Sequence, residues 1–310
     1  MVKFFKSIVL SFKPISYLFR LSQRIIIPGF DGLPLYNVSV FFVKGLTERS
    51  ITQRASAISF SMFMALFPTI IFMFTLIAYV PIPNFQQVLL DNISNLVPDN
   101  TYDVVRLTLE DIVTRQRGEL LSVGFFLAFI FSTNGIMSLM AAFNSTYHDI
   151  ETRSLVWQYI ISFFLVIVLA FFVIISISMI IIGPRTLELI VQHITTNKKI
   201  IYYLLYSIKW LLVLISIFML TSLLFYIAPN KKTRFRFISP GSTLTTVLFV
   251  LSSVGFNYYI NHFGKYNKLY GSIGTLLIVM VWIYVNAIVL LIGFELNASI
   301  KQAKLKAGKT

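Results

Sequence analysis

The chain has 310 residues, of which 57% are hydrophobic and 12% are charged, and it contains no cysteine. Soluble domains carry about a quarter of charged residues, so this composition excludes a soluble globular domain and indicates a membrane protein. The missing cysteine excludes disulfides, thiolate nucleophiles and cysteine metal sites, while the net charge of +14 admits nucleic acid, an anionic membrane surface or an acidic substrate as partner.

The first 27 residues carry five cations, which fall within an arc of about 100° on a helical wheel. They are Lys3, Lys6, Lys13, Arg20 and Arg24. Because the cations interrupt any uncharged hydrophobic run, we expect no cleavable signal peptide. Two interpretations stay open: a helix that lies on the anionic cytoplasmic leaflet, or a helix packed on the body of the protein. Both predict that residues 1–53 form an amphipathic cytoplasmic segment.

Six stretches are apolar and long enough to cross a bilayer, which needs about 20 residues of helix. They are 55–80, 120–143, 158–183, 209–228, 238–260 and 271–297. The sequence therefore predicts an all-α polytopic membrane protein, with a six-helix domain over 54–298 and a basic cytoplasmic tail over 299–310.

Lysine and arginine are about twice as frequent on the side of the membrane that holds both chain ends as on the other. This bias predicts that the N-terminus and the C-terminus are cytoplasmic. The long loop 81–119 then lies outside. Its apolar residues recur at helical spacing between several acidic residues, so we expect amphipathic helices there.

The same distribution explains the net charge, because most cations flank the predicted spans on one side. Arg234-Phe235-Arg236-Phe237 alternates basic and aromatic residues, a pattern that can stack on bases, but it occupies a short inner loop. We therefore predict membrane lipids as partners, especially anionic lipid on the cytoplasmic face, and no nucleic acid.

Four motifs in a fixed order, over about residues 45–300, resemble the YihY/BrkB family of bacterial membrane proteins, also labelled virulence factor BrkB. They are Arg54-Ala55-Ser56-Ala57-Ile58-Ser59-Phe60 with Ala65-Leu66-Phe67-Pro68; Ser132-Thr133-Asn134-Gly135-Ile136 with Ala142-Phe143-Asn144-Ser145-Thr146-Tyr147; Tyr226-Ile227-Ala228-Pro229-Asn230-Lys231-Lys232 with Pro240-Gly241; and Tyr270-Gly271-Ser272-Ile273-Gly274 with Trp282-Ile283-Tyr284 and Gly293-Phe294-Glu295-Leu296-Asn297-Ala298. The resemblance implies a six-helix inner-membrane protein. It supplies no settled activity, although the family once carried a ribonuclease label.

Polar residues within the predicted spans are candidates for a polar path or for contacts between helices. Polar groups at membrane depth are costly unless they are satisfied, so we expect Asn134, Asn257, Asn286 and Glu295 to face the bundle interior. The asparagines fit hydrogen bonds between helices as well as a substrate pocket. An ionisable Glu295 needs a partner, for which Arg54 and the basic inner loop are the candidates.

Small and helix-breaking residues predict where helices approach or bend. Ala57, Ser61 and Ala65 repeat at four-residue spacing, which predicts a thin face for close packing. Pro68 removes a backbone hydrogen bond and is expected to kink the first span. At the start of the sixth span, Gly271 and Gly274 fit a close contact or a hinge.

No catalytic or metal-binding constellation is recognisable in the sequence. His148, His193 and His262 fall on different predicted loops, and no phosphate-binding or nucleophile motif occurs. We therefore expect no enzyme activity, no metal and no cofactor. The leading hypothesis is an envelope transporter or a lipid-translocating protein. A membrane scaffold or assembly factor is the alternative, followed by the family's former ribonuclease label, and the oligomeric state stays open.

Overall fold

The computed structural model describes residues 22–48, 50–79, 90, 110–146, 153–192, 198–230, 238–263 and 272–308. Within these ranges the chain is helical apart from loops and one isolated antiparallel bridge between Ile26 and Pro34. Most of the cationic segment 1–24 lies outside the described residues, as do His148, His193 and most of the loop 81–119, whereas His262 falls in the last turn of a described helix and not in a loop.

Among the described residues, six helices are long and apolar enough to cross a membrane, which confirms the predicted six-helix membrane fold. They are α4 (Ile51–Ile77), α7 (Gly118–Thr146), α8 (Leu155–Gln192), α9 (Lys198–Ile227), α10 (Pro240–Phe263) and α12 (Ser272–Lys306). A shorter helix, α3 (Leu35–Glu48), precedes them.

The last helix differs from the sequence prediction of a separate basic tail that begins at residue 299. Helix α12 continues to Lys306, and its last turns pack against the loop that precedes α3 and against α3 itself. Ile300 and Ala303 are buried there beside Phe30, Leu33 and Val38. The lysines of this stretch are separated by apolar residues, so one face of the helix stays apolar and keeps packing.

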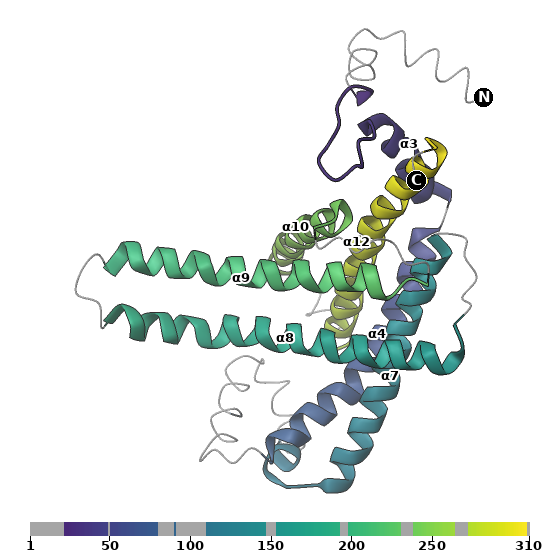
Figure 1. Ribbon diagram of the computed structural model, residues 1–310. Helices are drawn as coiled ribbons and strands as arrows, with labels where there is room; N and C mark the ends of the chain where they lie inside the picture. Colours follow the sequence, from purple (N-terminus) through teal and green to yellow (C-terminus); the bar gives the residue numbers. More distant parts are fainter. Residues whose placement is uncertain are drawn as a thin grey trace.

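The helices form two groups, which meet where the start of α8 and the end of α9 reach the other helices (Figure 1). Helices α4 and α7 pair along their length, and α12 packs against α4, α10 and α3. Helices α8 and α9 form a second pair, which extends away from the first group in Figure 1. The described end of α12 lies close to α3, so the first and the last of these helices meet at the same end of the bundle.

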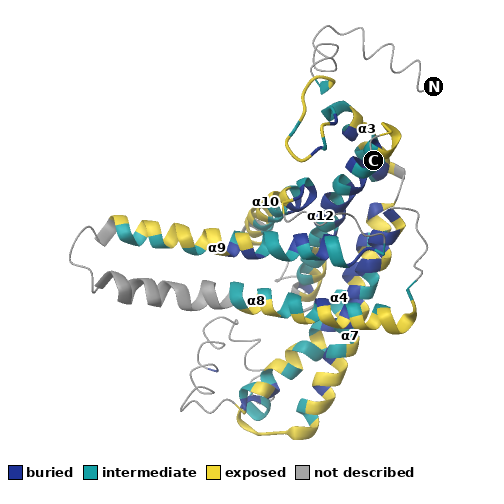
Figure 2. Cartoon of the chain, viewed as in Figure 1, coloured by how far each residue is buried: buried dark blue, intermediate teal, exposed yellow. Residues whose placement is uncertain are grey.

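The hydrophobic core lies where α4, α7, α9 and α12 meet, as the dark residues of Figure 2 show. At its centre, the ring of Phe143 stacks on that of Phe294 with centroids 4.1 Å apart, and the Phe225 ring meets both edge-on at 5.6 Å. Phe143 and Phe294 are almost completely buried. Three aromatic rings from three helices therefore fix how α7, α9 and α12 cross.

The three residues of the predicted thin face of the first span do not lie on one buried side of α4. Ala65 is buried, and the hydroxyl groups of Ser61 and Ser138 lie 2.8 Å apart across the α4–α7 contact. Ala57 is exposed instead, because the buried side of α4 at that level runs through Ala55 and Ile58.

The other predicted bending and close-contact positions have mixed outcomes. Helix α4 continues through Pro68 as one element, and the kink stays a prediction. Gly274 is buried in the first turn of α12, while Gly271 lies outside the described residues.

Candidate functional site: a polar layer at one end of the bundle

Polar side chains form contacts between helices around the start of α4 and the end of α7. We call this set the terminal polar layer. It consists of Arg54, Asn144, Thr146, Arg153, Ser239, Glu295 and Asn297. Five members lie at or near the ends of α4, α7, α8 and α10, where helix termini leave backbone groups without intrahelical partners. Glu295 and Asn297 lie inside α12, which continues to Lys306.

One guanidinium group connects three helices. Arg54, in the first turn of α4, has its Nη2 atom 3.9 Å from Oε2 of Glu295 on α12, and the two side chains are 12% and 1% exposed. Its Nη1 atom donates to the carbonyl oxygen of Ala142 (2.9 Å) and to the hydroxyl of Thr146 (2.7 Å), both on α7. The positive charge of Arg54 therefore interacts favourably with the negative, C-terminal end of the α7 dipole and with the Glu295 carboxylate.

Helix α3 covers the Glu295 carboxyl group. A Cβ atom at Gly45 would overlap that carboxyl group, so only glycine lets α3 approach so closely. Because Glu295 is 1% exposed, a ligand could reach its carboxylate only after α3 or Arg54 moved.

The contact between α10 and α12 is equally close. The backbone N–H of Gly241 donates to Oδ1 of Asn297 (2.8 Å), and Nδ2 of Asn297 donates to the hydroxyl of Ser239 (3.0 Å). Ser239 caps the start of α10, where its hydroxyl accepts from the Ser242 N–H at 3.1 Å. A Cβ at Gly241 would overlap the carbonyl oxygen of Gly293. An α12 side chain therefore satisfies a donor at the start of α10.

Two further contacts fasten the end of α9. Oδ1 of Asn144 accepts a hydrogen bond from the Asn230 N–H at 2.8 Å, which joins α7 to the chain after α9. Nη2 of Arg153 donates to the carbonyl oxygen of Ala228 at 2.9 Å and so caps the end of α9. Three of the four motifs that suggested the family therefore contribute residues to this layer, and the third motif contributes backbone groups that the layer contacts, at Ala228, Asn230 and Gly241.

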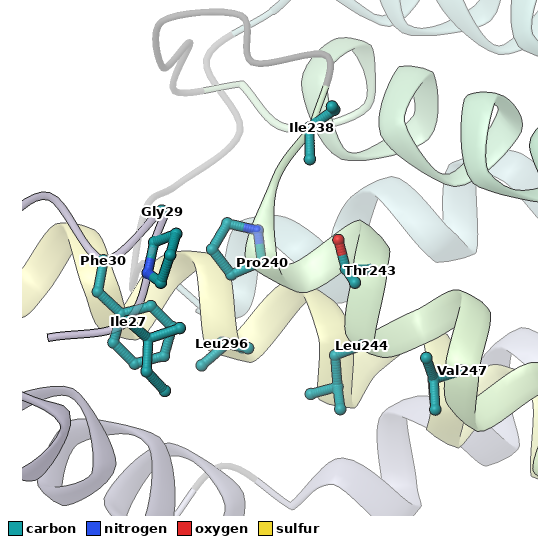
Figure 3. A pocket seen from close by; sticks show the side chains of 10 residues that line it. Ile27, Gly29, Phe30, Ile238, Pro240, Thr243, Leu244, Val247 and Leu296 are labelled. Atoms are coloured by element: carbon teal, nitrogen blue, oxygen red, sulfur yellow. The ribbon is translucent and has the colours of Figure 1, made fainter. Parts of the chain in front are cut away.

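An apolar pocket adjoins the polar layer (Figure 3). It has a volume of about 470 Å³ and lies between the loop at 27–30 and the first two turns of α10. Ile27, Phe30, Leu244, Val247 and Leu296 supply most of its apolar lining. The one hydroxyl in the lining, that of Thr243, donates to the Ser239 carbonyl oxygen at 3.0 Å, so the pocket presents mainly hydrocarbon.

The structure brings together only two of the predicted intramembrane polar residues, Arg54 and Glu295. Asn134 and Asn257 are exposed, which contradicts the expectation that they face the bundle interior. Asn134 faces outward because the buried side of α7 at that level is formed by Thr133, Gly135 and Ile136. Asn286 is half-buried, and its Nδ2 donates to the Trp282 carbonyl of its own helix at 2.7 Å.

Sequence reasoning did not single out Gly45, Thr146, Arg153 or Asn297 as site residues. Thr146 and Asn297 occur inside the family motifs, so the motifs held a signal for them. No sequence signal pointed to Gly45, because its role follows from the close approach of α3 to Glu295. Among the residues that the structure describes, no three His, Asp or Glu side chains form a group able to hold a metal ion.

Residues 42–310 match the family described as virulence factor BrkB. A Bacillus subtilis protein with a ribonuclease-like name, YfkH, is 28% identical over 81% of this chain and 90% of its own length. A UPF0761 membrane protein of Haemophilus influenzae is 22% identical over 87% of this chain and 97% of its own length. Another UPF0761 membrane protein, from Vibrio campbellii, is 25% identical over 92% of this chain and 86% of its own length.

No solved structure matches the chain. The family match covers all six candidate spans, and the relatives named as membrane proteins match over most of their length. These findings agree with a multi-pass protein of the bacterial inner membrane. The chain belongs to the virulence factor BrkB family.

Proposed function

We propose that this protein is an envelope transporter or lipid-translocating protein without enzymatic activity, whose substrate is an amphiphile such as a phospholipid. The observation that carries the proposal is the contact between the apolar pocket and the terminal polar layer. Leu296 lines the pocket between Glu295 and Asn297 in the chain, and Pro240 lines it between Ser239 and Gly241. An amphiphile needs both kinds of surface side by side.

The proposal gives the Arg54–Glu295 pair the role of a gate. A buried ion pair stabilises a fold less than well-packed apolar residues of similar volume often do. Ionisable groups within membrane segments are functional candidates by default. We therefore assign the pair to a closed state, in which α3 covers Glu295. Separation of the pair would expose the carboxylate and the guanidinium to a lipid headgroup.

Orientation belongs to the same proposal. We place both chain ends in the cytoplasm and the anionic lipid of the cytoplasmic leaflet against the cationic side. Reporter fusions at residue 1, Thr152, Thr233 and residue 310 should read as cytoplasmic, and fusions at Asn100, Asn197 and Lys265 as external. An external C-terminus would overturn this orientation.

Reconstitution into liposomes with labelled phospholipids tests the transport proposal. Wild-type protein should move the label between leaflets faster than protein-free vesicles. Leu244→Trp should slow this movement because it fills the pocket, whereas Leu251→Trp, at a 61%-exposed position on the same helix, should not. Glu295→Gln should lower stability, because Arg54 loses its carboxylate partner, and the fraction that stays folded should lose activity, because the charge assigned to the headgroup is gone. Label movement no faster than in empty vesicles would refute lipid translocation.

The competing functions make different predictions in the same preparation. A membrane scaffold should yield a stable partner on cross-linking in cells and show no transport defect in the Leu244→Trp variant. The ribonuclease-like name of the Bacillus relative motivates a second control. Purified protein free of soluble nucleases should leave tRNA precursors intact, and processing of the precursors would refute the non-enzymatic proposal.

A further inference from the structure

Helix α7 has three faces, and two of them are covered by other helices. One face packs on α4, where Ser138 meets Ser61 and where Gly135 lies against Met62. A second face packs on α8, where the ring of Phe129 lies 4.9 Å from that of Phe163. The third face carries exposed apolar side chains, although α7 is long and apolar enough to cross the membrane.

The third face has the residue spacing of a coiled-coil seam. Its side chains are separated alternately by four and three positions along α7, which is the spacing of the a and d positions of a heptad repeat. They are Val123, Leu127, Ile130, Asn134, Met137 and Ala141. Met137 is half-buried and the other five are exposed, so the seam is open along most of about five turns of helix.

One polar residue interrupts this seam. Asn134 is exposed and makes no hydrogen bond through its side chain among the residues that the structure describes. With a rise of 1.5 Å per residue, it lies about 18 Å from the nearer end of α7, so its short side chain cannot reach an aqueous interface. An amide in hydrocarbon without a hydrogen-bond partner is costly. The position therefore calls for a polar partner at membrane depth.

We propose that this seam pairs α7 with α7 of a second copy of the chain, and that the two Asn134 amides hydrogen-bond to each other. Copies with the same orientation in a membrane are related by a two-fold axis along its normal, so their α7 helices are parallel and in register. An asparagine amide has both a donor and an acceptor, which makes it self-complementary. A single asparagine at an a position fixes register and oligomeric state in parallel dimers.

This pairing is independent of the proposed transport function, because the seam and the pocket residues lie on different helices. The rival occupant for Asn134 is a lipid headgroup on its way across the bilayer. The two occupants differ in a measurable way. A second copy brings the a positions of two α7 helices within disulfide distance of each other, whereas a lipid does not.

The chain contains no cysteine, so single cysteines report this contact without background. Leu127→Cys and Ala141→Cys, at a positions, should form disulfide-linked dimers when native membranes are treated with copper phenanthroline. A disulfide requires Cα atoms less than about 7 Å apart. Phe125→Cys is the matched control, because Phe125 is 48% exposed on the same helix but contacts Phe72 of α4. Equal cross-linking at Phe125, or none at the a positions, would overturn the proposal.

Variants of Asn134 test the hydrogen bond itself. Asn134→Leu should lower the association constant of the dimer in detergent by between about three- and tenfold, whereas Asn134→Gln should largely retain it. Light scattering after size-exclusion chromatography measures the dimer fraction. If Asn134→Leu leaves dimerisation unchanged and slows movement of labelled lipid, then Asn134 serves the lipid, and the dimer contact is refuted.

Discussion

The two ends of α7 are held in different ways. At its C-terminal end, Asn144 and Thr146 are buried and make hydrogen bonds to other parts of the chain. Towards its N-terminal end, Phe125, Phe126 and Ile130 are 48%, 62% and 49% exposed. Along α7, the described side chains therefore make buried hydrogen bonds to other parts of the chain at the C-terminal end, while apolar side chains are exposed toward the N-terminal end.

Helix geometry accounts for this difference. In the middle of a helix the backbone groups bond to one another, so neighbouring helices need only match in shape. At a terminus, donors and acceptors lack intrahelical partners. In the terminal polar layer these partners come from other helices. Arg54 donates to the Ala142 carbonyl oxygen and Arg153 donates to the Ala228 carbonyl oxygen, while Asn297 accepts from the Gly241 N–H. The layer is therefore a set of helix caps supplied by neighbouring helices.

The strongest test of this comparison breaks the ion pair. Glu295→Leu leaves the Arg54 cation, 12% exposed, without its carboxylate. We expect the free energy of unfolding, measured by SDS titration in mixed micelles, to fall by about 3–5 kcal/mol. Replacement of both residues by leucine should recover part of this loss, because no buried charge is then left alone.

An exposed ion pair at the other end of the bundle provides the control. Arg115 and Asp111 approach to 3.3 Å with side chains 73% and 33% exposed. Arg115→Gln should lower the free energy of unfolding by less than about 1 kcal/mol. Equal losses for Arg115→Gln and Glu295→Leu would contradict the view that the terminal polar layer holds the bundle together.

The sequence predicted the six helices because their length and apolar composition set them apart from the loops. It also offered Arg54 as a partner for Glu295, since both lay at one predicted end of the bundle. The prediction that Asn134 and Asn257 face the bundle interior was wrong. A helix that is apolar all round gives no sign of which face packs against other helices. Gly45 left no signal, because its importance depends on how α3 crosses α12, a contact between segments far apart in the chain.

A smaller effect is expected where α10 meets α12. Gly241→Ala places a methyl group against the Gly293 carbonyl and the Asn297 amide, so we expect a loss of about 1–3 kcal/mol from overpacking. Gly255→Ala on the same helix has no atom within 4 Å of the added carbon. It should gain up to about 1 kcal/mol, because alanine favours helix over glycine. Thermal unfolding in detergent compares the two variants, and equal shifts would argue against a tight α10–α12 contact.

The smallest effect compares two asparagines ten positions apart on α7. Asn144→Ala removes the acceptor for the N–H of the half-buried Asn230, so we expect a loss of about 1–3 kcal/mol in the free energy of unfolding. Asn134→Ala removes no hydrogen bond within one copy of the described chain, so at dilutions where the protein is monomeric it should change the free energy of unfolding by less than about 0.5 kcal/mol. At higher protein concentration, Asn134→Ala should lower the free energy of unfolding relative to wild type. The reason is that dimer formation stabilises the folded protein in a concentration-dependent way. A loss for Asn134→Ala that is large and independent of concentration would mean that the middle of α7 is held by polar contacts after all.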